Sequence, residues 1–124
     1  MSEARDPDAV FEALCSNHAR EILVAAEDEP RSAQSLAERC GTSLPTVYRR
    51  VNALVEQDLL EEVVRVADDG NHYTLYVSNL ETVRLDIERT GFSATVRLKR
   101  DIVDRFGAFW RDLGDRPEEV GRTR

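Results

Sequence analysis

The chain of 124 residues has few of the features from which membrane, secreted and catalytic proteins are built. It contains no run of about 18 apolar residues, which argues against a membrane-spanning helix. Its first ten residues are polar and acidic, so we expect no signal peptide. It has only two cysteines and no sign of secretion, and we therefore expect reduced thiols in a cytoplasmic protein.

Residues for catalysis or metal binding are equally scarce. With two histidines, the chain offers no Ser/His/Asp or Cys/His arrangement in a motif context, and it has no glycine loop for phosphate. Cys15 and His18 stand three residues apart, but zinc would need two further ligands. We predict that the protein is not an enzyme and has no metal or cofactor. Cys15 is a candidate redox switch, whereas the simpler interpretation makes both cysteines small buried apolar residues.

The charged residues are unusual in type and in distribution. Lys99 is the single lysine beside sixteen arginines, and the net charge is −7. This composition resembles that of proteins from halophilic archaea, in whose salty cytoplasm attraction to phosphate is weak. Residues 1–30 carry −6 and residues 56–80 carry −5, whereas residues 31–55 carry +3. The basic segment indicates a nucleic-acid contact, while the acidic remainder favours a protein partner.

The basic segment has the pattern of two short helices joined by a tight turn. Ser32 can cap a first helix that runs to about Cys40, and Gly41 can end it in a left-handed conformation. Ser43 can cap a second helix, with Pro45 in the first turn, where the missing N–H is not needed. This spacing predicts a helix-turn-helix.

The second of these helices has two contrasting faces. Its apolar face is formed by residues at helical spacing, namely Leu44, Val47, Val51, Leu54 and Val55. The opposite face carries small and basic residues, namely Pro45, Thr46, Arg49 and Ala53, flanked by Arg50 and Asn52. Such a face suits a helix that enters the major groove of DNA.

The surrounding pattern extends the motif to a larger fold. Residues 7–14, capped by Asp6, predict a first helix, and Ser16 or Asn17 can cap a second one over residues 18–29. The β-rich runs 62–66 and 72–77, separated by turn residues, predict a hairpin. The fold class is therefore α+β: a winged helix-turn-helix DNA-binding domain over residues 8–80.

The remaining residues predict a second unit over residues 81–113 and a flexible tail over 114–124. Residues 82–88 and 92–98 alternate between apolar and polar, as in a second hairpin, although a single amphipathic helix through 80–98 is the alternative. Residues 99–113 predict a helix with an aromatic face, which either forms a homodimer or packs on its own domain. The expected dimer interface is Val10, Phe11, Leu14, Ile102, Val103, Phe106, Phe109, Trp110 and Leu113.

Segments 18–23, 36–41, 43–54 and 58–61 resemble the ArsR-like winged-helix regulators, particularly the small single-domain ones of halophilic archaea. The resemblance implies a homodimer that binds double-stranded DNA. Two departures stand out. Ser32 and Gln34 occupy the positions where metal-sensing members have a Cys-x-Cys pair. The wing tip, residues 68–70, is acidic where such tips are often basic, which shifts wing contacts to Arg65, Asn71, His72 or Tyr73.

Together these patterns predict a homodimeric, sequence-specific transcription regulator. Arg49 is expected to read a base and Arg50 to contact a phosphate, while Arg31 and Arg39 lie within reach of the DNA backbone. The expected DNA contacts are Ser43, Pro45, Thr46, Tyr48, Arg49, Arg50, Asn52, Arg65 and His72. The alternatives are a winged-helix protein-interaction module that does not bind DNA, and a regulator that responds to oxidants through Cys15.

Overall fold

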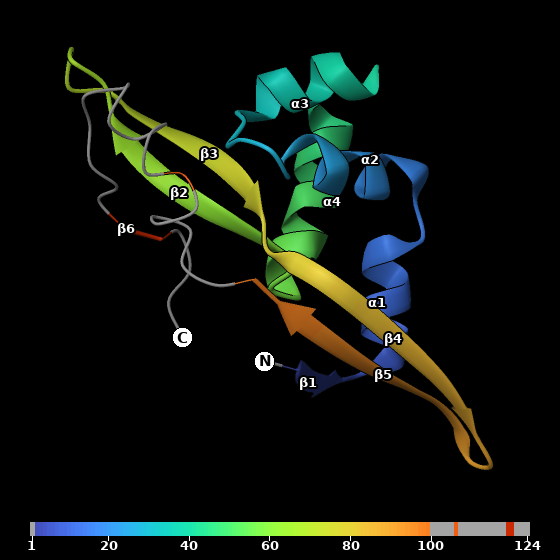
Figure 1. Ribbon diagram of the computed structural model, residues 1–124. Helices are drawn as coiled ribbons and strands as arrows, with labels where there is room; N and C mark the ends of the chain where they lie inside the picture. Colours follow the sequence, from blue (N-terminus) through green and yellow to red (C-terminus); the bar gives the residue numbers. More distant parts are fainter. Residues whose placement is uncertain (1, 100–105, 107–118, 121–124) are drawn as a thin grey trace.

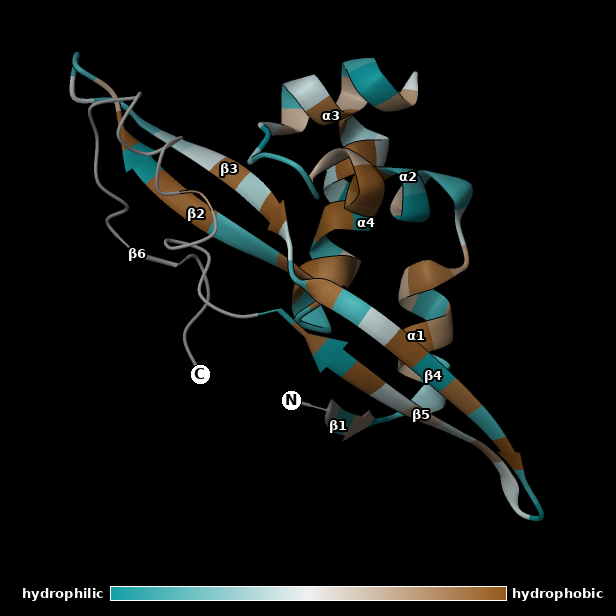
Figure 2. Cartoon of the chain, in the orientation of Figure 1, coloured by the Kyte–Doolittle hydropathy of each residue, from teal (hydrophilic) through white to brown (hydrophobic). Residues whose placement is uncertain are grey.

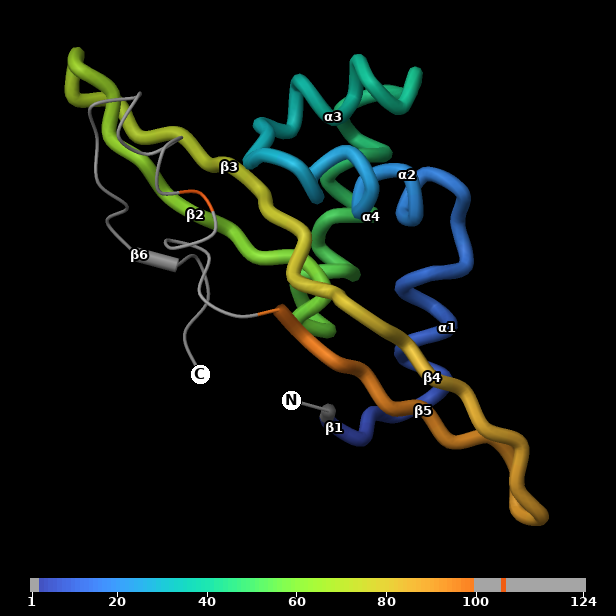
Figure 3. The backbone as a smooth tube through the Cα atoms, viewed as in Figure 1, coloured from blue at the N-terminus to red at the C-terminus, as the bar shows by residue number. Residues whose placement is uncertain are grey.

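The computed structural model describes residues 2–99, 106 and 119–120. In these residues, four helices gather on one side, and two long β-hairpins extend from them toward opposite ends of the molecule (Figures 1 and 3). The elements are β1 (Ser2–Arg5), α1 (Pro7–Leu14), α2 (Asn17–Ala25), α3 (Ala33–Cys40), α4 (Leu44–Glu56), β2 (Leu60–Val66), β3 (His72–Ser78), β4 (Leu80–Glu88), β5 (Gly91–Leu98) and β6 (Glu119–Val120). This order confirms the α+β winged helix-turn-helix.

The capping residues set the helix starts as predicted. The side chains of Asp6, Ser16, Ser32 and Ser43 each accept a hydrogen bond from a backbone N–H in the first turn of the helix that follows. Helix α2 is shorter than the sequence pattern predicts: it ends at Ala25 and not near residue 29. The three acidic residues 27–29 lie where the helix dipole is negative, and Pro30 follows them.

Helices α3 and α4 are each followed by a residue in the left-handed backbone conformation. Gly41 has φ 63° and ψ 40°, and its N–H and that of Thr42 reach back to the last turn of α3. At the end of α4, Asp58 has φ 66°, and Leu59 N donates to Leu54 O at 2.9 Å. Asp58 thus adopts a conformation that glycine usually supplies.

The wing is the hairpin β2–β3, in which Leu60 faces Ser78 and Val66 faces His72. Arg31 fixes β3 to the helices, because its N–H and C=O pair with Tyr76 at 3.0 and 2.7 Å. The Arg31 side chain donates to Ala25 O at 2.6 Å and is about one-tenth exposed. The side chain closes the turn after α2, which leaves little of it for the expected contact with the DNA backbone.

Residues 80–98 form the second hairpin, β4–β5, so the alternative of a single helix is wrong. Its apolar residues alternate with polar ones along both strands (Figure 2). An unexpected strand, β1, pairs antiparallel with β5 and gives a sheet of order β1-β5-β4. The N-terminal segment thus completes a sheet, although its sequence, SEAR, has no β-branched or aromatic residue.

One hydrophobic core joins the helices to the second hairpin. Ile22, Leu36, Val51 and Leu54 are fully buried in the same cluster as Val96 of β5. Helix α1 packs on β5 and on α4, so it closes the space between them. This shared core spans the boundary expected between residues 80 and 81.

A smaller cluster covers the other face of the wing. Val63, Leu75 and Val77 are buried there, and Tyr73 and Phe106 pack against them. Strand β6, which lies in the segment expected to be a flexible tail, pairs with Val63 and Val64 of β2. Apart from Lys99 and Phe106, the helix expected over residues 99–113 lies outside the described residues, as do Ile102, Val103, Phe109, Trp110 and Leu113.

No helix in the described part of the chain is long and apolar enough to cross a membrane.

Candidate nucleic-acid interface

Helix α4 is held by one face and exposes the other. Val47, Val51 and Leu54 are fully buried against the neighbouring helices, which fixes the orientation of the helix about its axis. Pro45, Arg49 and Asn52 are exposed on the opposite side, as the sequence pattern predicted. Leu44 was assigned to the apolar face but is 40% exposed, because it begins the first turn at the open end of the core.

Three exposed or half-exposed side chains form a hydrogen-bonded ridge along the first turns of α4. Ser43 Oγ accepts from Thr46 N at 3.4 Å and donates to Thr46 Oγ1 at 3.1 Å. Arg49 Nη2 then donates to Thr46 Oγ1 at 3.3 Å. The spacing of three residues places these groups one above another on a helix. We name Ser43, Thr46 and Arg49 the polar ridge; it holds the Arg49 guanidinium beside the Thr46 hydroxyl in the first turn of α4.

Arg50 and Tyr48 flank the polar ridge. Arg50 is half-buried, and its Nε is buried with no hydrogen-bond partner among the described residues. The side chain therefore runs along the protein before its terminal nitrogens reach the surface. Tyr48 is 49% exposed. Arg39, on α3, is also exposed. Arg49 thus lies on the exposed side of α4 with cationic and hydroxyl groups at its sides.

The wing supplies fewer candidate contacts than expected. Asp68 and Asp69 are exposed at the tip, and Asp69 is occupied by two hydrogen bonds from Asn71, both 3.0 Å long. His72 is exposed at the start of β3. Tyr73 packs on the cluster of Val63, Leu75 and Val77, so it is part of the wing rather than of its free surface.

The prediction that Arg65 contacts DNA is wrong, because its side chain is fully buried. In the β2–β3 register Arg65 faces Tyr73, and it shares the strand face of Val63. Strand alternation therefore directs it to the smaller apolar cluster. A period-two analysis of residues 60–66 places Arg65 and Val63 on one face, but it does not tell which face is covered.

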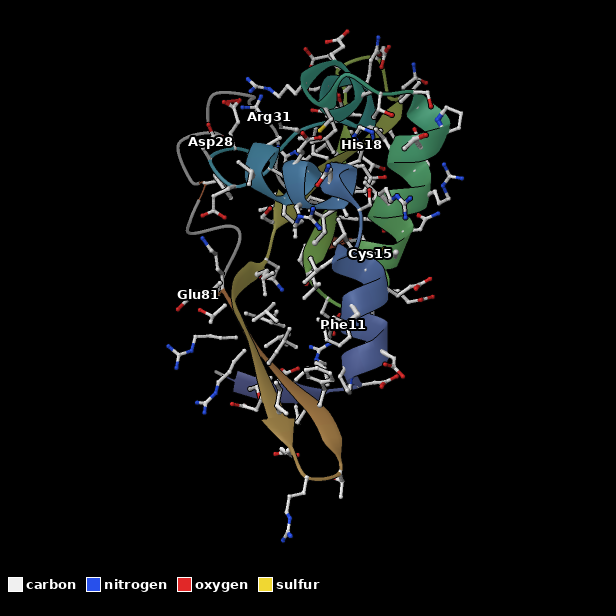
Figure 4. The ribbon with its side chains drawn as sticks, turned by 90° about the vertical axis from the view of Figure 1, so that its right-hand side faces the viewer. Phe11, Cys15, His18, Asp28, Arg31 and Glu81 are labelled. Atoms are coloured by element: carbon white, nitrogen blue, oxygen red, sulfur yellow. The ribbon has the colours of Figure 1, made fainter. Side chains whose placement is uncertain are left out.

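Of the predicted dimer residues, Val10 does not fit its role, since it is 1% exposed and belongs to the main core. Leu14 is half-buried against the same core. Phe11 is 38% exposed, and its ring meets that of Phe92 edge to face, with centroids 5.7 Å apart. Figure 4 shows Phe11 where α1 meets the second hairpin. Sequence reasoning missed Phe92 as its partner.

The two cysteines differ in their surroundings. Cys15 is exposed, and its thiol donates to Glu12 O at 3.2 Å. Cys40 lines a shallow cavity of about 380 Å³ between α2 and α3, beside Arg20, Glu21 and Arg39. Burial, and secondarily the Glu21 carboxylate, raise the pKa of the Cys40 thiol. His18 Nδ1 lies 3.2 Å from Glu21 Oε1, so the imidazole faces a carboxylate rather than Cys15.

No group of three or more His, Cys, Asp or Glu side chains within residues 2–99 is placed to hold a metal ion.

Comparison with known proteins agrees with this geometry. Residues 9–63 match a protein family described as a helix-turn-helix domain, and the matched segment runs from α1 into β2. No curated protein and no solved structure is significantly similar to the chain. The chain therefore contains a helix-turn-helix domain, in which α3 and α4 are the two helices of the motif.

Proposed function

We propose that this protein is a sequence-specific DNA-binding transcription regulator that acts as a homodimer. The observation that carries the proposal is the polar ridge, which presents Arg49 on the exposed side of a recognition helix whose other side is fully buried. An arginine so placed can donate two hydrogen bonds to the O6 and N7 atoms of guanine. We assign the protein no catalytic role and place it in the cytoplasm.

The flanking residues divide the remaining contacts. Arg50 and Tyr48, at the sides of α4, are placed for phosphate oxygens, which fix register without reading sequence. Asn52 and Pro45 complete the groove-facing surface. At the wing, the proposed phosphate contact is His72 alone, because the Arg65 side chain is buried. The acidic pair Asp68–Asp69 makes insertion of the wing tip into the minor groove unfavourable.

The net charge of −7 makes a monomer a poor DNA ligand, which is why we include the homodimer. Two recognition helices double the number of base contacts, and such dimers bind half-sites about 34 Å apart. We propose that the protein acts in a cytoplasm of high salt concentration. Its acidic, lysine-poor composition and its resemblance to ArsR-like regulators of halophilic archaea support this. There base contacts contribute a larger share of affinity than phosphate contacts do.

The test is selection of genomic fragments by the protein at high potassium concentration, followed by affinity measurements with Arg49→Ala and Arg50→Ala. We expect Arg49→Ala to abolish the preference for the selected site, whereas Arg50→Ala weakens binding to all sequences alike. Arg97→Ala is the matched control, since Arg97 is exposed on β5 and not on α4. Equal affinity for selected and random fragments, or no effect of Arg49→Ala, would overturn the proposal.

One observation favours a second candidate function. The exposed carboxylates at the wing tip are more typical of a surface that binds a basic protein than of one that binds DNA. A winged-helix interaction module would bind such a partner with an affinity that falls when Asp68 and Asp69 are both changed to Asn. If the same double change instead strengthens DNA binding, the regulator is favoured.

The exposure of Cys15 also supports a thiol-responsive form of the regulator. Cys15→Ser is then expected to remove any change in DNA affinity caused by oxidants, and an unchanged response would exclude Cys15 from regulation.

A further inference from the structure

The outer edge of β4 is an open strand edge. In the order β1-β5-β4, β4 has a strand partner on one side only among residues 2–99. It is nine residues long and contains neither proline nor lysine, and its charged residues Glu81, Arg84, Asp86 and Glu88 are of both signs. A long edge of this kind is a template for pairing with another strand.

The hairpin geometry identifies the backbone groups that point outward. Glu88 and Gly91 pair across the two-residue loop. The pair that closes such a loop is the hydrogen-bonded kind, and the alternation along the ladder then directs the amides of Asp86 and Arg84 toward β5 as well. The amides and carbonyls of Val83, Leu85 and Ile87 therefore point to the open edge. The side chains of these three residues lie on the apolar face of the hairpin.

That apolar face is covered only in part. Helix α1 packs on β5, and the β4 half remains open, with Leu85 and Ile87 exposed by 44% and 82%. Phe92, opposite Ile87 in the register, is 54% exposed and touches Phe11. We name Phe11, Leu85, Ile87 and Phe92 the hairpin patch. A contiguous aromatic and aliphatic surface of this kind marks an interaction site.

We infer that β4 pairs antiparallel with β4 of a second copy of this chain, with the two-fold axis at Leu85. In this register Leu85 faces Leu85 of the partner subunit, and Val83 faces the partner's Ile87. Both pairs use the outward-pointing amides. Arg84 faces the partner's Asp86, and Asp86 faces the partner's Arg84. The two sheets become one, and the two hairpin patches lie on the same face.

Charge selects this register and this occupant. Within one chain Arg84 Nε lies 3.1 Å from Asp86 Oδ2, and both side chains are exposed, by 73% and 41%. Moving the two-fold axis to residue 84 would oppose two arginines, and moving it to residue 86 would oppose two aspartates, which is unfavourable in cross-strand pairs. The register about Leu85 alone gives two attractive pairs, as expected for a self-complementary interface.

The chain's own C-terminal segment is a less suitable occupant. Phe106 packs on Val63, Leu75 and Val77, and β6 pairs with β2, so the described parts of that segment lie on the wing sheet. The second hairpin extends in the opposite direction from the wing (Figure 3). The inference rests on the proposed homodimer and supplies its interface.

A cysteine cross-link tests the register directly, in a protein whose Cys15 and Cys40 are changed to Ser. Leu85→Cys places two thiols across the two-fold axis, at a Cα separation of about 5.5 Å that a disulfide accepts. The matched control is Ile87→Cys, whose copies are about 14 Å apart in this register. We expect mild oxidant to cross-link the Leu85 variant only, although Ile87 is the more exposed residue. Cross-linking led by Ile87→Cys, or absent from both, would overturn the inference.

Charge reversal gives an independent result by sedimentation equilibrium. Arg84→Asp or Asp86→Arg should raise the dimer dissociation constant by about tenfold or more, and the double exchange should restore it. Arg97→Asp, on the polar face of β5, should leave it unchanged. A monomeric wild type overturns this interface together with the homodimer, while base reading by Arg49 is measured separately. A dimer whose dissociation constant does not change when Arg84 or Asp86 is reversed in charge would overturn this interface but not the homodimer.

Discussion

Arg5 and Asp58 form a largely buried ion pair that joins β1 to the end of α4. Arg5 Nη2 lies 3.2 Å from Asp58 Oδ2, and the two side chains are 14% and 8% exposed. Arg5 Nη1 also donates to Gln57 O at 2.8 Å, so the guanidinium binds the carbonyl end of α4, where the helix dipole is negative. The pair fixes the direction in which α4 leads into the wing.

Arg5→Ala should lower the free energy of unfolding by about 3 kcal/mol, because it leaves the buried Asp58 carboxylate without this cation. Urea titration followed by circular dichroism measures the change. Arg39→Ala removes an exposed arginine and should change stability by less than about 0.5 kcal/mol. A loss for Arg5→Ala no greater than that of the control would show that the pair contributes nothing.

Gly41→Ala should destabilise the protein by about 1 to 2 kcal/mol through backbone strain alone. In the described part of the chain, no atom beyond Gly41 and its two neighbours lies within 4 Å of the position that a Cβ would take, so a steric clash adds nothing. Gly41→Asn should be milder, because asparagine tolerates the left-handed conformation. Thermal unfolding of the two variants distinguishes them. Equal losses for Ala and Asn would exclude strain as the cause.

Stability should fall as the pH rises from 10 to 12. Burial, then the Glu62 carboxylate and Tyr48, raise the pKa of Tyr76 from 10.0 to about 12. In this range the unfolded chain releases the phenol proton while the folded chain keeps it, which favours unfolding by up to about 3 kcal/mol. Below pH 10 the group has no effect.

Tyr76→Phe removes this titration, so its unfolding free energy should decline less steeply between pH 10 and 12 than that of the wild type. Denaturant titrations at stepped pH measure both slopes. Parallel declines in the two proteins would contradict the assignment to Tyr76.

Thr46→Val should lower the preference for the specific DNA site without unfolding the helix. The change keeps the side-chain shape but removes the oxygen that accepts from Arg49 Nη2 at 3.3 Å. If the proposed DNA contact is correct, affinity for the preferred site falls about threefold to tenfold, while affinity for random DNA is retained. Fluorescence anisotropy with both DNAs measures the ratio. Thr90→Val, in the exposed loop of the second hairpin, is the control. An unchanged ratio would mean that the polar ridge does not position Arg49.

The sequence by itself determined the secondary structure of residues 7–98 closely. Capping residues such as Ser32 and Ser43, the left-handed Gly41 and the alternation in the two hairpins act over a few residues, so local patterns were sufficient. The exposed face of α4 followed for the same reason, because helical spacing alone separates Arg49 from Val47.

Tertiary structure alone decided which faces are covered and which distant residues meet. Arg65 and Val10 were assigned to surfaces and are buried, because a strand or helix pattern shows that two faces differ but not what packs on each. Arg5 and Asp58 lie far apart in the chain, and no local signal joins them. The place of β4 at the edge of its sheet, among the described strands, likewise follows from the pairing of β1 with β5 and not from the sequence of β4. Local interactions therefore set the elements, and long-range packing set which of their residues remain free to bind.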